Sequence, residues 1–322
     1  MKKSIGFHAL AGACLVVGAL GLAACSPGKP DGKAANAPAA APRQDQKDAK
    51  EVEKYNHYID AANVGTESFA QQLGRYEERV VPRLQAKAPL QYFDVARRSS
   101  EVDKIKTELN AGLAMAAPMP ALDQAAKDYA GAMERLAPLT HELEDYASSK
   151  GYLADEGAKA REKGAAYLAA LRDAVSAEGK FMAAVDEQDI INVKQSFDKQ
   201  KEGTVAYFRA GLLYRAKLSM PLAHAFFANP ANDQARAAFK ASLDEVNAML
   251  TGMEAKAPSD KSVVCGRIKM NTNNFLAAGR EAAAEIKGEP KDESEANRLN
   301  WHVRNLTQDF NQMIQVFNQN GC

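Results

Sequence analysis

The sequence predicts an all-α fold, an antiparallel helical bundle of about seven or eight helices with long, heptad-patterned first and last helices. Three observations predict it. Apolar residues recur in steps of three and four along most of the chain after residue 49, and turn residues separate the resulting segments. No stretch shows the sustained period-two alternation of a half-buried strand, so we expect no sheet.

The heptad pattern is clearest at the two ends of this region. The first segment carries apolar or aromatic residues from Val52 to Val80, among them Tyr55, Ile59 and Phe69, and the last carries them over 299–317. A seam kept over several heptads is typical of a long helix that packs lengthwise on a neighbour. We therefore expect one long helix at each end.

Shorter periodic segments fill the interval between these two helices. They lie at 102–109, 122–136, 154–186, 188–228, 239–253 and 259–287. Clusters of Pro, Gly, Asn and Ser predict the breaks between helices at 117–120, 149–151, 229–230, 258–260 and 288–290. Pro138 and Pro221 fall inside helical patterns, where we expect them to kink or interrupt the helix.

The amino terminus predicts export and lipidation. Lys2 and Lys3 precede an uncharged run over 5–24, as in a secretory signal peptide. The run is long enough for a retained membrane helix, but it contains four glycines and ends on small residues directly before a cysteine. Leu22-Ala23-Ala24-Cys25 resembles the bacterial lipobox. The sequence thus predicts a signal peptide at 1–24 and a lipid on Cys25.

The segment after the cysteine predicts a disordered tether at 25–48, followed by a helical domain at 49–322. Residues 26–48 contain no large apolar side chain, so they cannot bury enough surface to offset the entropy of ordering. Several acyl chains, as bacterial lipoproteins carry, would make the attachment stable. Ser26, in place of the aspartate that retains lipoproteins in the inner membrane, favours the outer membrane facing the periplasm, if the host is Gram-negative.

Two further cysteines, Cys265 and Cys322, remain after export. An even pair in an exported chain predicts one disulfide, and two free thiols are the alternative. If the last two helices form an antiparallel pair about 288–293, the start of the first lies near the end of the second. The predicted hairpin and the predicted disulfide therefore support each other.

Charge and motifs exclude several function classes. Lys and Arg number 41 and Asp and Glu also number 41, so no basic field favours nucleic acid, and we expect no nucleic-acid partner. Phosphate loops, nucleophile elbows, HExxH and CxxC motifs are absent from the sequence. We therefore expect no enzyme, no catalytic residues, no metal and no cofactor. Carboxylates such as Glu142 and Asp145 are interpreted as solvated surface charge.

Three sets of residues leave alternatives open. His141 and Glu144 are one helical turn apart and slightly resemble the His-x-x-Glu motif of imelysin-type periplasmic proteins, but Leu139 stands where that motif has Gly, and a charged exterior face explains the pair better. Aromatic clusters at 55–58 and 207–214 fit a core or a ligand groove. Asparagines crowd 271–311, where they either form interhelical hydrogen bonds or present a recognition face.

Short motifs at both ends resemble one lipoprotein family. Lys54-Tyr55-Asn56-His57-Tyr58-Ile59 followed by Asn63, together with the aromatic-Asn pairs at 310–311 and 317–318, is similar to the YiiG-type bacterial lipoproteins. The closing pairs have Phe where that family has Tyr. The family's function is uncharacterised, so the resemblance implies a lipoprotein with an all-helical domain and no site residues.

These observations predict a lipid-anchored, non-enzymatic binding or scaffold module at the cell envelope. It would be attached to the membrane through Cys25, and it would present the helical domain to an envelope protein or ligand. The alternative is a periplasmic small-molecule or metal-binding module with its site between helices, where bundles usually keep one.

Overall fold

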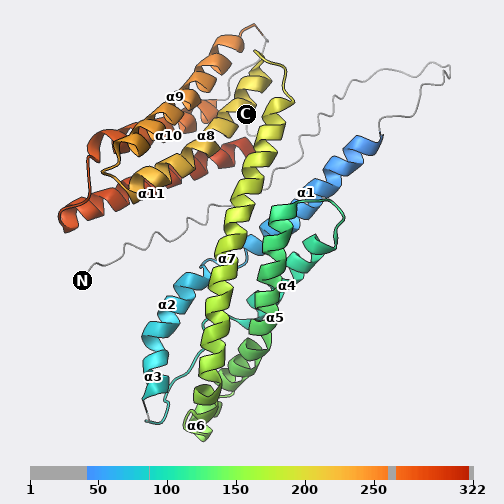
Figure 1. Cartoon of the computed structure of the whole chain (residues 1–322), viewed down its shortest axis with the longest axis vertical. Helices are drawn as coiled ribbons and strands as arrows, with labels where there is room; N and C mark the ends of the chain where they lie inside the picture. Colours follow the sequence, from blue (N-terminus) through green and yellow to red (C-terminus); the bar gives the residue numbers. More distant parts are fainter. Residues whose placement is uncertain (1–41, 87, 260–265, 319–322) are drawn as a thin grey trace, which may run out of the picture. The chain divides into compact units, whose positions relative to one another are not determined.

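The computed structural model describes residues 42–86, 88–259 and 266–318. The all-α prediction is confirmed, because the described residues form helices and no strand. The helices are α1 (Pro42–Ala62), α2 (Phe69–Arg79), α3 (Val81–Gln85), α4 (Ser99–Ala114), α5 (Pro120–Ser148), α6 (Gly151–Ala154), α7 (Ala158–Asp198), α8 (Val205–Ala228), α9 (Asp233–Lys256), α10 (Gly266–Glu285) and α11 (Glu293–Asn318) (Figure 1).

The prediction of one long first helix is wrong, because the chain breaks between α1 and α2. Gly65 adopts φ +84°, a left-handed conformation that a helix cannot contain. Ser68 then caps α2: its hydroxyl accepts from the Gln71 backbone N–H and its own N–H donates to the Gln71 side chain. The heptad pattern of apolar residues continues across the break, but the helix does not.

The predicted break near residue 187 is also misplaced. α7 runs without interruption to Asp198, and the chain turns at 199–204, where Gly203 has φ +75°. Thr204 caps α8 by accepting from the Tyr207 N–H at 3.2 Å. Pro138 and Pro221 do not interrupt their helices, since α5 and α8 continue past them.

The chain divides into two compact units. Among the described residues, one comprises 42–185 and is called here the amino-terminal unit; the other comprises 186–318 and is called the carboxy-terminal unit. The boundary falls inside α7. The helical domain predicted at 49–322 thus contains two compact units.

Aromatic rings form the centre of the amino-terminal unit. The Phe181 ring on α7 contacts Tyr58 from α1 at a centroid distance of 6.1 Å and Tyr129 from α5 at 5.4 Å. Phe69 on α2 contacts Tyr129 edge to face at 6.4 Å. Large rings that meet edge to face fill space and add to the stability that burial alone gives.

A buried charge lies beside this aromatic core. The Lys54 ammonium is 2.7 Å from Asp123 Oδ1 and donates to the carbonyls of Met115 and Ala117 at 3.2 and 2.7 Å. The Tyr58 hydroxyl donates to the same Asp123 oxygen at 2.6 Å. Lys54 is only 3% exposed, so these partners replace the water that its charge loses on burial.

The carboxy-terminal unit contains a four-helix arrangement made by α8, α9, α10 and α11 (Figure 1). Each helix packs on the next along the chain and α11 also contacts α8. Phe275 on α10 contacts Phe310 on α11 at 5.8 Å, and Glu285 near the end of α10 lies 3.1 Å from His302 near the start of α11. These pairings run in opposite directions, so α10 and α11 form the expected antiparallel pair.

The predicted lipidation and disulfide residues, Cys25, Cys265 and Cys322, all lie outside the described residues, and these assignments stay predictions. The same holds for most of the predicted tether, although α1 begins at Pro42, before the expected boundary at 49. Within the part of the chain that the structure describes, no helix is both long and apolar enough to span a bilayer.

Candidate functional site

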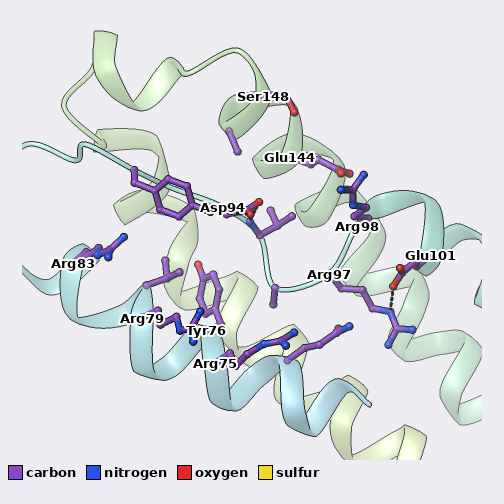
Figure 2. Close-up of a pocket in the computed structure, with 16 residues that line it drawn as sticks. Arg75, Tyr76, Arg79, Arg83, Asp94, Arg97, Arg98, Glu101, Glu144 and Ser148 are labelled. Carbon is purple, nitrogen blue, oxygen red and sulfur yellow. Dashed lines mark hydrogen bonds and ion pairs between the residues drawn. The ribbon is translucent and has the colours of Figure 1, made fainter. Parts of the chain in front are cut away.

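The amino-terminal unit contains a cleft of about 830 Å³ between α2–α3, the segment 92–98 and the end of α5 (Figure 2). Sixteen residues line it: Gln72, Arg75, Tyr76, Arg79, Val80, Arg83, Tyr92, Asp94, Val95, Ala96, Arg97, Arg98, Glu101, Glu144, Ala147 and Ser148. Five of them are arginines and three are carboxylates. The cleft is therefore polar and carries an excess of positive charge.

The first wall is a stripe along α2 and α3. Gln72, Tyr76, Arg79 and Arg83 follow one another at intervals of four, three and four residues, which places them on one helical face. The capping box at Ser68 fixes the start of this helix. The stripe begins with two buried polar residues and ends with two exposed arginines.

The second wall is the segment 92–98, and Arg97 holds it in place. Arg97 is 3% exposed and lies 2.9 Å from a Glu101 oxygen; it donates to the carbonyls of Glu67, at 3.3 Å, and Val64. Its guanidinium also lies over the Phe69 ring, 4.4 Å from the centroid. Arg97 therefore has a structural role, because its charge is already matched.

The third wall comes from the carboxyl end of α5. Ser99 is the first residue of α4, and its backbone N–H donates a hydrogen bond of 2.8 Å to Glu144 Oε2. A carboxylate at a helix amino terminus is favoured by the exposed N–H groups there and by the helix dipole. Glu144 thus fixes the start of α4 and, with it, the position of Arg98 (Figure 2).

Three arginines in the cleft have no acidic partner among the described residues: Arg79, Arg83 and Arg98. Arg83 lies over the Tyr92 ring, 5.7 Å from the centroid, and makes no ion pair. By contrast, Arg75 pairs with Glu67. Arg79 and Arg83 come from the first wall and Arg98 from the second, so their fields add within the cleft.

Within the described part of the chain, three buried polar atoms at the cleft have no hydrogen-bond partner. One is the Arg97 Nε, which lies 2.9 Å from a Glu101 oxygen in an ion pair, and the other two belong to neutral side chains. They are the Tyr76 hydroxyl and the Gln72 Oε1, in side chains that are 3% and 7% exposed. Figure 2 shows the Tyr76 hydroxyl pointing from α2 toward the segment that carries Asp94. Burial, and secondarily the nearby Tyr167, raise the pKa of Tyr76 above its ordinary value. The hydroxyl therefore keeps its proton and can donate it.

Buried polar atoms are almost always paired in folded proteins, because an unpaired one costs about 1–3 kcal/mol. Two such atoms on one helical stripe, beside unpaired arginines, mark this cleft as the candidate functional site.

The histidine motif singled out from the sequence does not form a site. His141 Nε2 lies 2.7 Å from Asp103 Oδ2 on α4, in an exposed pair, while Glu144 binds the Ser99 N–H. Both residues thus connect α5 to α4. Among the described residues no group of three or more His, Cys, Asp or Glu side chains could hold a metal ion.

The aromatic clusters divide between core and partly exposed positions. Tyr55 and Tyr58 are buried, as the core interpretation predicts. Phe197 stacks on Tyr214 at 5.7 Å and contacts Tyr207 at 4.7 Å, and these rings are only partly buried. They are packed against one another.

Among the described residues of α10 and α11, the asparagines form no interhelical hydrogen bond, which was the first of the two interpretations drawn from the sequence. Asn271 donates to the Arg267 carbonyl of its own helix at 2.8 Å. Asn273, Asn274, Asn297 and Asn300 are exposed.

Sequence reasoning missed the arginine-lined cleft. One signal was present: Arg75, Arg79 and Arg83 recur every fourth residue, as on one side of a helix. The opposite wall gave no signal, because the segment 92–98 is irregular and its contacts with α2 are long-range.

A family model described as a protein of unknown function, DUF3829, matches residues 49–319. The match covers most of the sequence and both compact units, so the chain belongs to that family. No curated protein and no solved structure matches the chain at a significant level.

Proposed function

We propose that this member of the DUF3829 family is a non-enzymatic binding module of the cell envelope, which takes an anionic ligand into the arginine-lined cleft. A lipid on Cys25 would attach it to the membrane, with the outer membrane facing the periplasm as the predicted location. The module would thus combine the membrane anchor predicted at Cys25 with a ligand site between helices, which was the alternative function predicted from the sequence.

The observation that carries the proposal is the set of three unpaired arginines, Arg79, Arg83 and Arg98, in one cleft. Like charges that line one cleft repel, and an anion bound there is attracted to them. The planar guanidinium group binds carboxylates and phosphates through two parallel hydrogen bonds. The cleft is therefore prepared for an oxyanion.

The carboxylates of the cleft favour binding over catalysis. Glu144 accepts from the Ser99 N–H and Glu101 pairs with Arg97, so both hold the walls in place. Asp94 accepts from the Val95 N–H at 2.9 Å and from the Tyr92 hydroxyl at 3.1 Å. Each acid has a structural partner, whereas a general acid or base needs to face the reacting group.

The test is calorimetric titration of the full chain, purified in detergent, with inorganic phosphate and with acetate. Arg79→Gln is expected to weaken binding at least about tenfold, because a charged hydrogen bond contributes about 1.5–3 kcal/mol. Arg304→Gln is the matched control: it removes the same charge from an exposed position on α11. Equal affinities in Arg79→Gln and wild type would contradict the proposal, and so would a failure of both anions to bind.

A further inference from the structure

The ligand of the cleft can be specified more closely, in an inference that rests on the proposed function. We infer that the ligand is a hydroxylated acid, such as a sugar phosphate or a sugar acid. Its acidic group would bind Arg79 and Arg83, and its neutral hydroxyl groups would reach Tyr76 and Gln72.

Along the stripe, charged side chains lie at one end and neutral hydrogen-bonding side chains at the other. Arg79 and Arg83 are exposed cations at one end, and Tyr76 and Gln72 are buried neutral groups at the other. Side chains three or four residues apart on a helix are neighbours, about 5–6 Å apart at Cβ. One small molecule can therefore contact both kinds of side chain where they meet, at Tyr76 and Arg79.

The two buried groups have complementary hydrogen-bonding needs. The Tyr76 hydroxyl carries a proton to donate, and the Gln72 Oε1 needs a donor. A deprotonated carboxylate or phosphate oxygen accepts from Tyr76 but cannot donate to Gln72. A hydroxyl group does both, so the buried end of the stripe fits the neutral part of a ligand and not a second anion.

The size of the cleft agrees with this assignment. At about 830 Å³ it lies within the range of small-molecule sites, roughly 300–1,000 Å³, and far exceeds what a bare oxyanion fills. The Tyr92 ring beside Arg83 is 52% exposed and offers a flat apolar face at the mouth of the cleft. Such a face suits the C–H groups of a sugar ring.

The experiment compares acids with and without hydroxyl groups on the full chain in detergent. The probes are glucose 6-phosphate against inorganic phosphate, and glucuronate against acetate. In one of these pairs we expect the hydroxylated acid to bind at least about tenfold more tightly, which corresponds to one or two additional hydrogen bonds. The pair that shows the difference identifies the acidic group as phosphate or carboxylate.

Two variants assign the difference to the buried end of the stripe. Tyr76→Phe keeps the ring that packs on Tyr167 and removes only the hydroxyl. Gln72→Leu is a second, independent variant in case the first disturbs the fold. Each is expected to bring the affinity for the hydroxylated acid close to that for the bare acid.

The outcomes distinguish this inference from the proposed function. If the bare acid binds as tightly as the hydroxylated acid, and Arg79→Gln weakens both, the proposed function stands and the hydroxylated ligand is wrong. If both variants at the buried end keep the full preference, the inference is equally overturned. If none of the probes binds, the proposed function itself fails.

Discussion

Two adjacent arginines have opposite roles in the cleft. Arg97 is buried and its guanidinium is matched by Glu101, two carbonyls and the Phe69 ring. Arg98 is exposed and has no acidic partner in the described chain. The local sequence offers Arg97 only Glu101, four residues later. Its other partners, the two carbonyls and the Phe69 ring, lie about 30 residues earlier in the chain.

The buried Lys54–Asp123 pair makes the sharpest stability prediction at the scale of residues. Asp123→Asn removes the counter-charge of an ammonium that is 3% exposed. Breaking a fully buried pair in this way costs about 3–5 kcal/mol, and the lower end applies here because Asp123 is itself 27% exposed. We expect urea unfolding followed by circular dichroism at neutral pH to show a loss of about that size. A loss as small as that of the control, Asp173→Asn in an exposed pair with Arg135, would contradict this role.

The same pair predicts a pH dependence. Burial raises the pKa of Asp123, but hydrogen bonds from Lys54 and Tyr58 lower it more, so the pKa lies below its ordinary value of 3.8. The ionised carboxylate therefore stabilises the fold above that value, and the contribution is lost as the pH falls through the lowered pKa. The stability difference between wild type and Asp123→Asn should shrink correspondingly below about pH 4.

At the scale of elements, the sequence predicted the presence of the helices, but it predicted only some of the positions at which they end. The turns at 117–120, 149–151, 229–230 and 288–290 were found, because proline and glycine interrupt the pattern there. The break after α1 was missed because the apolar spacing continues through Gly65. That turn depends on Arg97, which binds the Val64 and Glu67 carbonyls, a long-range contact that periodicity does not contain.

Glycines within helices give a paired prediction at this scale. A Cβ on Gly112 of α4 would lie 2.5 Å from the Tyr58 ring of α1, whereas a Cβ on Gly179 of α7 would have nothing within 4 Å. Gly112→Ala should therefore destabilise the chain by about 1–3 kcal/mol through overpacking. Gly179→Ala should stabilise it by up to about 1 kcal/mol through helix propensity. Thermal unfolding of the two variants tests this, and shifts of the same sign would refute the close α1–α4 contact.

The cleft itself is a product of the whole amino-terminal unit. Its walls come from α2–α3, the irregular segment 92–98 and α5. The sequence could therefore predict only the regular spacing of the arginines on the first wall. The buried Tyr76 matched the heptad seam and was read as core. Its ring is indeed core, in contact with Tyr167 at 5.4 Å, and only the unpartnered hydroxyl reveals a second role.

The antiparallel pairing of α10 and α11 supports the predicted Cys265–Cys322 disulfide at the scale of the molecule. Phe275 meets Phe310 and Glu285 meets His302, so the start of α10 pairs with the end of α11. In the sequence, the start of α10 directly follows Cys265 and the end of α11 shortly precedes Cys322. The intact mass of the full chain, measured under denaturing conditions, should rise by two hydrogen atoms on reduction. The same mass should include acyl chains on Cys25. Alkylation of both thiols without reductant would rule out the bridge.

The central claim is that unpaired arginines make the cleft an anion site, and phosphate titration at low and high salt tests it most directly. Wild type and Arg304→Gln should bind alike, and Arg79→Gln at least about tenfold more weakly. Binding should weaken as salt screens the exposed guanidinium groups. Phosphate that binds Arg79→Gln as tightly as wild type, or that is insensitive to salt, would contradict the account.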